Sequence, residues 1–410
     1  MTPPRDDAPS AHTAPPEWRP LRVAVVSETW PPEVNGVAAT ASRVVAELRV
    51  LGHELQLLRP RQHPGDTAAH ERGQAEVLVP GLPIPRYPQL RMGLPSRRLL
   101  RRLWGLQRPD VVHLVTEGPL GWGALQAARA LRLPVVSDFR TNFHAYSRHY
   151  GLAWLQRPIA GYLRHFHNRT ACTMVPTEAL RAELQAQGFG NLRVVARGVD
   201  THRFDPAHRS DELRRRWGAG PADLVALHLG RIAPEKNLET LLAAHAAMQR
   251  RDPRLKLVFV GDGPARGAMQ QRCPQAHFAG LQRGEALAAH VASADVLLFP
   301  SVTETWGNVV PEAMASGLAV VAFDCAAAGQ LVRHGHNGLL ARVGDEAGFC
   351  AAAARLAGAP GPARALGAEA RAVALQLDWG RIALEVEAEY RRAIARAPRP
   401  GLGGLSARPA

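Results

Sequence analysis

The chain alternates short apolar runs with longer amphipathic stretches. The run Val23–Val26 ends in a loop rich in Pro, Asn and Gly, a helical pattern follows to Gly52, and the next apolar run is 53–60. The same order recurs later, with a strand that ends at Leu229, a loop, and a helix from about Asn237. Strand, loop and helix in repeated order are typical of βαβ units, which build parallel sheets.

Further apolar runs extend both halves of the chain. They predict two α/β domains, each a doubly wound, Rossmann-like parallel sheet, that face a central cleft. In such sheets ligands bind outside the carboxyl ends of the strands. Helical patterns near 121–132 and 178–187 and several short helices separate these runs, which are 110–115, 134–139, 172–177, 256–261, 277–281, 294–300, 318–323 and 338–341.

The stretches between these patterns predict how the chain divides. One is charged and turn-rich, as a linker would be, and another near the end has the pattern of an amphipathic helix. The predicted parts are a disordered leader (1–19), an N-terminal domain (20–200), a linker (201–222), a second domain (223–377), an amphipathic helix (378–396) and a flexible tail (397–410).

The composition is that of a soluble globular protein, and its bias toward arginine weakens any conclusion from the high net charge. The 410 residues are 46% hydrophobic, and the formal charge of +14 suggests nucleic acid or an anionic membrane as a partner. However, the chain has only two lysines, Lys236 and Lys256, among 50 basic residues, which indicates the arginine bias of a GC-rich genome. A retained lysine therefore suggests a site that needs a compact ammonium group.

Cysteines and apolar content predict a cytoplasmic protein. Four cysteines lack the spacing of a zinc site or a disulfide framework, the first residues have no apolar core of a signal peptide, and no run is long enough to span a membrane. Attachment to the inner face of the cytoplasmic membrane stays open. The cysteines are Cys172, Cys273, Cys325 and Cys350.

Two loops of the second half have the residues of a phosphate site. Arg231 and Lys236 follow a strand, where a guanidinium and an ammonium suit a diphosphate. Gly261 and Gly263 follow the next strand and would allow close backbone approach. An isolated basic pair is more often a solvated turn, but the position after a strand favours function.

A third loop, "SVTETWGNVVPEAMASG" at 301–317, contains two glutamates. Glu304 lies in the loop, Asn308 is a candidate N-cap, Glu312 falls in the first turn of the helix, and Gly317 ends that helix. Free N–H groups of the first turn suit phosphate, and Glu312 can accept hydrogen bonds from a ribose diol. Each glutamate alone is also explained as a loop charge or a helix-terminal acid.

Together these loops resemble the carboxyl-terminal domain of retaining glycosyltransferases of family 4, which have the two-Rossmann-domain GT-B fold. The resemblance covers about 20–396 and is nearest to bacterial GDP-mannose-dependent α-mannosyltransferases. It implies that Arg231 and Lys236 bind the donor diphosphate and stabilise the leaving nucleotide. It also implies that Glu304 lies near the reacting sugar carbon and that Glu312 holds the ribose.

The resemblance extends to the rest of the donor site and to the first domain. His113 and Glu117 would approach the cleft from the acceptor or sugar side, as would Asn142. Many relatives have a histidine where this chain has Arg140, so a guanidinium there could engage an anionic group. Further donor-binding residues implied by the resemblance are Asn35, Gly36, Gly261, Gly263, Gly307 and Asn308.

The resemblance implies transfer of a hexose, mannose as the best guess, with retention of anomeric configuration. The donor would be a nucleotide-diphosphate sugar, GDP-mannose before a UDP-sugar, and the acceptor a lipid or glycan. The chain has no two aspartates at DxD spacing, in agreement with a metal-independent enzyme without a further cofactor.

The segment 96–108 has two interpretations. Its leucines, Trp104 and arginines could form a basic amphipathic helix that lies on an anionic leaflet. Alternatively, Leu99, Leu103 and Trp104 pack on the first domain. A test is the binding of anionic liposomes after replacement by Glu of Arg97, Arg98, Arg101 and Arg102.

Other functions have less support. A nucleic-acid-binding protein would need a recognisable module, and none is found. A nucleotide-sugar epimerase or a sugar phosphorylase on the same fold are the nearer alternatives. A phosphorylase with pyridoxal phosphate would need a lysine, and Lys256 opens an apparent buried strand.

Overall fold

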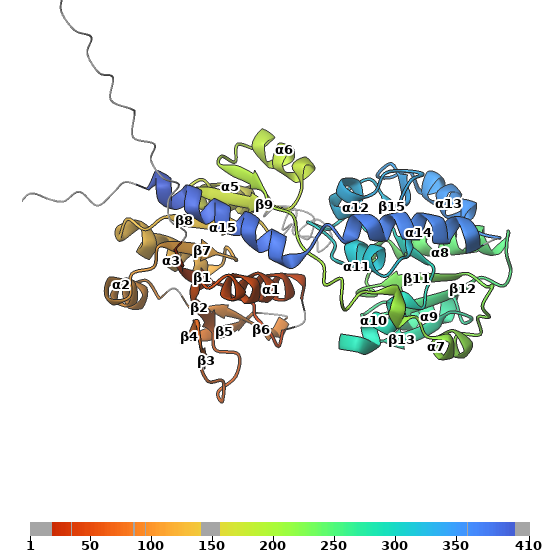
Figure 1. The fold of residues 1–410 in the computed structure, drawn as a ribbon, viewed down its shortest axis with the longest axis horizontal. Helices are drawn as coiled ribbons and strands as arrows, with labels where there is room; N and C mark the ends of the chain where they lie inside the picture. Colours follow the sequence, from red (N-terminus) through yellow and green to blue (C-terminus); the bar gives the residue numbers. More distant parts are fainter. Residues whose placement is uncertain are drawn as a thin grey trace, which may run out of the picture.

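The structure is a computed structural model that describes residues 19–397 except 34, 85–86, 95, 141–155 and 359. It contains two parallel sheets that lie side by side in separate lobes (Figure 1). Asn142 therefore lies outside the described residues.

The first sheet has the strand order β10-β9-β8-β7-β1-β2-β4-β3, and among these strands β3 alone is antiparallel to its neighbour. A separate hairpin of β5 (Gly81–Ile84) and β6 (Tyr87–Gly93) follows β4. The strands of the sheet are β1 (Arg22–Val26), β2 (Glu54–Pro60), β3 (His70–Glu71), β4 (Gln74–Val79), β7 (Val111–Leu114), β8 (Val135–Asp138), β9 (Cys172–Val175) and β10 (Leu192–Val194).

Helices cover both faces of this sheet because alternate strand residues enter different cores. In β1, Val23 packs with α1 and α15, whereas Val26 packs with α2 and α3. A strand buried on both faces is apolar at nearly every position, which explains its continuous Val and Ala run. The helices are α1 (Gly36–Val50), α2 (Arg97–Leu106), α3 (Pro119–Ala130), α5 (Gln156–His167), α6 (Glu178–Ala186) and α15 (Trp379–Arg396).

The second sheet is wholly parallel, in the order β13-β12-β11-β14-β15-β16. Its strands are β11 (Val225–Leu229), β12 (Lys256–Val260), β13 (His277–Gly280), β14 (Val296–Phe299), β15 (Ala319–Phe323) and β16 (Leu339–Ala341). One face packs against α8 (Leu238–Gln249), α9 (Arg266–Arg272) and α13 (Glu346–Arg355), and the other against α10 (Gly284–Ala292), α11 (Val309–Ala315) and α12 (Ala326–Leu331). The helix α14 (Pro360–Ala374) contributes residues to both cores. The predicted fold of two doubly wound parallel sheets is confirmed.

The segment between the two sheets is structured. It forms a 3-10 turn, η2 (Pro206–His208), and α7 (Asp211–Arg216). The buried Arg214 on α7 donates to Asp295 at 3.0 Å, and Asp295 also accepts from the backbone N–H of Val225 at 2.9 Å. Much of this segment is therefore packed onto the second sheet.

The last helix, α15, returns from the second lobe to the first (Figure 1). The Asp378 carboxylate caps it by accepting from the N–H of Gly380 at 2.8 Å. Its apolar side, which includes Trp379, Val386 and Tyr390, packs with α1 in the core of the first domain. The predicted amphipathic helix thus completes the cover of the first sheet.

Candidate active site

The predicted catalytic residues of the second domain meet where the strand order of its sheet reverses. Sequence runs outward from β11 to β12 on one side and from β14 to β15 on the other, so β11 and β14 flank the switch point. The loops after these two strands contain Lys236 and Glu304. A switch point at the carboxyl ends of parallel strands is where α/β sheets bind ligands.

Lys236 and Glu304 form an ion pair between these loops. The Lys236 Nζ contacts Glu304 Oε1, and Ser301 Oγ donates to the same oxygen at 2.9 Å. Both side chains are mostly buried, with 17% and 19% of their surface exposed. The ammonium is therefore held in place by a carboxylate, although it can still reach a ligand.

Arg231 lies on the same loop and is more exposed. Its Nη1 atom is 3.4 Å from the carboxylate of the buried Glu235. The loop then forms the turn η3 (Pro234–Lys236) and leads through Asn237, at φ +53°, into α8. Arg231 and Lys236 are thus presented by one short turn, as a site for two phosphate groups requires.

The glycines after β12 have a packing reason in this fold. A Cβ atom on Gly261, which has φ +137°, would lie 1.9 Å from the carbonyl oxygen of Gly230. A Cβ atom on Gly263 would lie 2.3 Å from the carbonyl oxygen of Ile232. The glycines therefore let the loops after β11 and β12 lie side by side.

The loop after β14 leads into α11, a helix of seven residues. Asn308 occupies the predicted N-cap position, but its side chain makes no capping hydrogen bond. Gly317 ends the helix at φ +77°, as predicted, and Gly307 also has positive φ, +87°. Burial raises the pKa of Glu312 to about 8, against the lowering effect of Arg203.

The first domain approaches α11 through the start of α1. A Cβ atom on Gly36 would lie 3.5 Å from the Nδ2 atom of Asn308. Asn35 caps α1, because its Oδ1 accepts from the N–H groups of Val37 and Ala38 at 3.1 and 2.8 Å. Gly36 is therefore beside the second domain, while Asn35 already has a local structural role.

His113, predicted to approach the cleft, lies beneath it in a buried chain of hydrogen bonds. Its Nδ1 atom is 2.8 Å from the hydroxyl of Tyr390 on α15, and its Nε2 atom is 3.0 Å from Asp138. Asp138 also accepts from the Nε atom of Arg140 at 2.6 Å. Burial opposes ionisation, but Arg140 and His113 hold the pKa of Asp138 well below its usual range.

Glu117 is also buried, beside a carboxylate that the sequence did not single out. The Glu117 Oε1 atom is 3.3 Å from His167 Nε2. Glu28, at the end of β1, accepts from the N–H of Leu120 in the first turn of α3 at 2.8 Å. Burial raises the pKa of Glu28 to about 7, which Glu117 reinforces. Glu28 follows β1 at the switch point between β1 and β7, and this position after a strand could have indicated a functional residue from the sequence.

Arg197 is a second residue that sequence reasoning missed. It follows β10, is only 8% exposed, and forms no hydrogen bond or salt bridge with any other residue that the structure describes. Burial, and then the neighbouring Arg140, lower the pKa of Arg197 to about 9. Its surroundings could not be read from the sequence, where it is one arginine in a turn-rich stretch.

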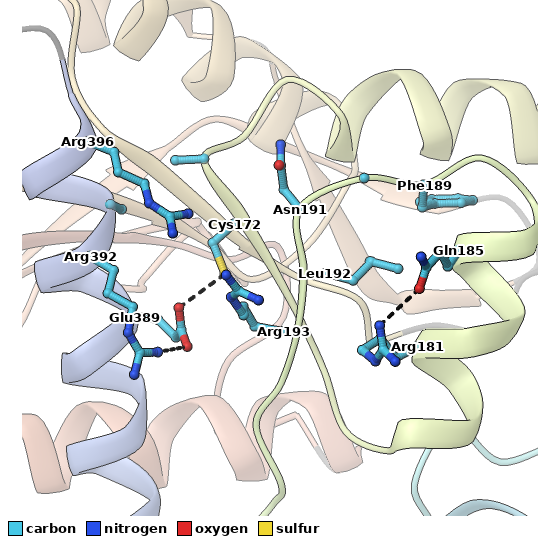
Figure 2. A pocket seen from close by; sticks show the side chains of 13 residues that line it. Cys172, Arg181, Gln185, Phe189, Asn191, Leu192, Arg193, Glu389, Arg392 and Arg396 are labelled. Atoms are coloured by element: carbon cyan, nitrogen blue, oxygen red, sulfur yellow. Dashed lines mark hydrogen bonds and ion pairs between the residues drawn. The ribbon is translucent and has the colours of Figure 1, made fainter.

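A cavity of about 290 Å³ lies elsewhere, between α6, β10 and α15 (Figure 2). The thiol of Cys172 and the guanidinium of Arg392 both reach the carboxylate of Glu389 there, and the sulfur lies 3.7 Å from its Oε2 atom. Burial and Glu389 raise the pKa of this thiol to about 12. None of the predicted site residues lines this cavity.

The side chains at the switch point are suited to binding an anion beside groups that accept hydrogen bonds. Lys236 and Arg231 can neutralise a diphosphate, and the Glu304 and Glu312 carboxylates can accept hydrogen bonds from hydroxyl groups. The lysine that a phosphorylase would need, Lys256, opens β12 at its amino end, the opposite end of the strands from Lys236. Within the described residues, no helix is both long and apolar enough to cross a membrane.

Sequence comparison matches each half of the chain to a family of glycosyltransferases. Residues 34–203 match the family described as Glycosyltransferase Family 4, and 223–358 match Glycosyl transferases group 1. A GDP-mannose-dependent alpha-mannosyltransferase from Mycolicibacterium smegmatis is 37% identical over 380 residues, which cover 92% of this chain and 98% of the relative. Another from Mycobacterium tuberculosis is 38% identical over 329 residues, 79% of this chain and 85% of the relative.

Solved structures share the fold. A sucrose-phosphate synthase from Thermosynechococcus elongatus superposes with a TM-score of 0.76 at 19% identity and covers 92% of this chain and 99% of its own. The Anabaena protein HepE, solved with UDP and glucose, gives 0.69 at 17% identity over 90% of this chain and 99% of its own. The fold and site thus define a glycosyltransferase of the GT-B type. The chain belongs to Glycosyltransferase Family 4.

Proposed function

We propose that this enzyme transfers mannose from GDP-mannose to a hydroxyl group of a lipid or glycan, with retention of anomeric configuration. The observation that supports the proposal most directly is the Lys236–Glu304 pair at the switch point of the second sheet. Relatives named for GDP-mannose, which match most of the chain, favour this donor over UDP-sugars.

In this proposal the second domain binds the donor. Arg231 and Lys236 bind its two phosphates, Glu304 faces the mannose, and Glu312 accepts hydrogen bonds from the ribose. Gly36 and Asn308 line the donor, because they lie where the two domains approach, and Gly307 lines it beside Glu304. The first domain then holds the acceptor.

The proposed reaction exchanges one bond for another on the same face of the sugar. The bond between the anomeric carbon and the diphosphate oxygen breaks, and the acceptor oxygen forms the new bond. The proton of the acceptor hydroxyl passes to an oxygen of the departing GDP. Charge on that leaving group is stabilised by Arg231 and Lys236, so a bound metal ion is not required.

A nucleotide panel tests the donor and the metal requirement. Purified enzyme is titrated calorimetrically with GDP and UDP, and GDP release is measured from GDP-mannose with and without EDTA. We expect binding of GDP to exceed that of UDP and EDTA to leave release unchanged. Preference for UDP would refute the donor, and loss of activity in EDTA would refute metal independence.

We propose further that the acceptor is a membrane lipid and that α2 docks the enzyme at the inner face of the cytoplasmic membrane. Two relatives are named for lipid products or acceptors, an alpha-monoglucosyldiacylglycerol synthase and a phosphatidylinositol dimannoside mannosyltransferase. In α2, Leu100 and Trp104 are buried, whereas Leu99 and Leu106 are 46% and 79% exposed. Leu103 and Trp104 pack on the first domain, as the alternative expects, whereas Leu99 does not. Leu99 and Leu106 lie among exposed arginines, an arrangement that suits interfacial binding.

Liposome binding tests this docking. We expect the full chain to bind vesicles of anionic lipid. Replacement by Glu of Arg97, Arg98, Arg101 and Arg102 should abolish binding, because each basic residue near an anionic surface contributes about 1 kcal/mol. Equal binding by both proteins, or none by the wild type, would refute α2 docking. A matched control replaces the exposed second-domain residues Arg215, Arg250, Arg251 and Arg283.

A further inference from the structure

Two buried guanidinium groups lie on the first domain beside the donor site. Arg140 follows β8 and Arg197 follows β10, so both are at the carboxyl edge of the sheet. Each is 8% exposed. The Thr305 hydroxyl, next to Glu304, donates to the carbonyl oxygen of Arg140 at 2.8 Å. These arginines therefore meet the second domain at its catalytic loop.

The carboxylates around these arginines are already engaged. Asp138 accepts from Arg140 and also contacts His113 at 3.0 Å. Glu304 is held by Lys236 and by the Ser301 hydroxyl. Among the described residues Arg197 contacts neither carboxylate, although both Asp138 and Glu304 lie near enough to raise its pKa against the effect of burial.

Hydrogen-bond donors are left over as well. The Nη1 atom of Arg140 is buried and has no hydrogen-bond partner. Arg197 donates to no other described residue, although its five N–H groups are fixed in one plane. Buried donors are nearly always satisfied, and a buried cation without a partner costs several kcal/mol, so such a site suits a partner that the described residues do not supply.

Arg197 remains charged at neutral pH, because burial and Arg140 lower its pKa only to about 9. Arg140 and Arg197 line one small cavity, and guanidinium forks match the geometry of a tetrahedral oxyanion better than that of a hydroxyl group. The diphosphate of the donor is met by Arg231 and Lys236 on the other domain. An anionic group other than the diphosphate would supply acceptors to these two arginines.

We propose that Arg140 and Arg197 bind an oxyanion carried by a substrate, at a site separate from the diphosphate site. The inference rests on the proposed function, because it assumes that a donor and an acceptor meet at this edge. The oxyanion is either the phosphate of an acceptor head group or an acidic group on the donor sugar. In both cases Arg197 determines specificity for a charged substrate over a neutral one.

The first test measures thermal unfolding of the full chain saturated with GDP, so that the diphosphate site is filled. Sodium phosphate is added against sodium chloride of equal ionic strength. We expect phosphate to raise the Tm of the wild type and of Arg197→Lys, and to have little effect on Arg197→Gln, whose apparent Kd for phosphate should rise roughly tenfold or more. The control Arg193→Gln, an exposed residue of β10, should behave as the wild type.

Two readouts separate binding from a structural role. Without ligand, Arg197→Gln should melt at the same temperature as the wild type or higher, because it removes an unpaired buried charge. A lower Tm would mean that Arg197 stabilises the fold and would overturn the proposal. So would a phosphate response equal to the wild type, or weaker binding of GDP to Arg197→Gln by calorimetry.

The source of the oxyanion is decided with matched substrates. Transfer from GDP-mannose is compared on vesicles of phosphatidylinositol and of diacylglycerol, and calorimetry compares UDP-glucuronate with UDP-glucose. A 10- to 100-fold larger KM of Arg197→Gln for phosphatidylinositol alone, about 1.4 kcal/mol for each tenfold, assigns the acceptor phosphate. Weaker binding of UDP-glucuronate alone assigns the donor sugar, and no selective change in either overturns the proposal. If no sugar is transferred, the proposed function fails while the thermal test still decides the anion site.

Discussion

At the scale of single residues, Lys236 is held by a carboxylate before any donor arrives. Its ammonium contacts Glu304, and the pair is mostly shielded from water. A phosphate that approaches this pair meets a cation already fixed in position, so little reorganisation is needed when charge develops on the leaving group.

We predict that Lys236→Ala lowers kcat roughly 100- to 1,000-fold, the usual loss when one preorganised donor to a developing charge is removed. Lys256→Ala, the matched control at the amino end of β12, should stay within about twofold of the wild type in kcat, since this partly exposed residue lies at the opposite end of the strands from Lys236. Steady-state kinetics on GDP-mannose measures both. A normal kcat in Lys236→Ala would show that the site is wrongly located.

In the proposed donor site, Glu312 would make the binding of GDP depend on pH. Its pKa in the free protein is about 8, so it is mostly protonated at pH 6. If its carboxylate accepts hydrogen bonds from the ribose, binding favours the ionised form. The affinity for GDP should then rise with pH up to about 8, by as much as tenfold per unit, and level off above.

Calorimetric titration of GDP between pH 5.5 and about 9 checks this prediction against Glu312→Gln, which lacks the titrating group. The variant should bind GDP more weakly than the wild type above pH 8. Its affinity should also lack the rise with pH that the ionisation of Glu312 gives the wild type. Identical pH profiles for the two proteins would contradict the ribose role of Glu312.

The places of the residues in the loops after β11 and β14 could be predicted, whereas the buried surroundings of residues in the first domain could not. Glu304, Lys236 and Gly317 belong to local strand–loop–helix patterns, which the sequence displays directly. The burial of His113 depends on Tyr390, which is 277 positions away on a helix that returns to the first sheet. Arg197 likewise acquires its surroundings only from tertiary packing.

At the scale of elements, the position of the donor loops depends on glycine. The loops after β11 and β12 approach so closely at Gly261 that any side chain there would overlap the Gly230 carbonyl. The positive φ of Gly261 adds strain for any other residue. A change at this point is therefore transmitted directly to the turn that presents Arg231 and Lys236.

We predict that Gly261→Ala destabilises the second domain by more than about 1 kcal/mol and weakens GDP binding, because the strand ends must separate. The control is Gly267→Ala in α9, where a Cβ atom would meet nothing within 4 Å and helix propensity improves by up to about 1 kcal/mol. Urea unfolding and GDP titration measure both effects. Equal stability of the two variants would refute this account of the loop.

The elements themselves were largely predictable because both faces of each sheet are buried, so strands appear as apolar runs between amphipathic helices. The elements at the periphery of the two sheets were harder to predict. The two-residue strand β3, the hairpin of β5 and β6, and α7 within the predicted linker have little apolar pattern of their own. They are fixed by contacts, such as that of Arg214 with Asp295, which link distant segments.

At the scale of the whole molecule, α15 joins the two domains. Trp379 begins the helix directly against the backbone of Gly198, where a Cβ atom would lie 2.5 Å from the indole ring. The helix then fills the core of the first domain. The stability of the first domain therefore depends on residues that follow the second domain in sequence.

We predict that Trp379→Ala lowers the free energy of unfolding of the first domain by about 3 to 5 kcal/mol, as is typical of a buried Trp. The control Leu384→Ala on α15, 53% exposed, should change it by less than about 0.5 kcal/mol. In calorimetric scans GDP should still shift the transition of the second domain in Trp379→Ala, since the donor loops are untouched. If Trp379→Ala lost GDP binding as well as stability of the first domain, the two domains would not be independent in stability.

The return of α15 to the first domain also affects the order in which the two domains can fold during synthesis. Synthesis from the amino end delivers the strands of the first sheet early, but the helix that shields one face follows the second domain in sequence. The second domain, whose strands and helices are contiguous in sequence, can fold before that moment. Until α15 has been synthesised, the core of the first domain on the side of α1 is therefore partly exposed to water. A chaperone that binds apolar surface would be most useful at this stage.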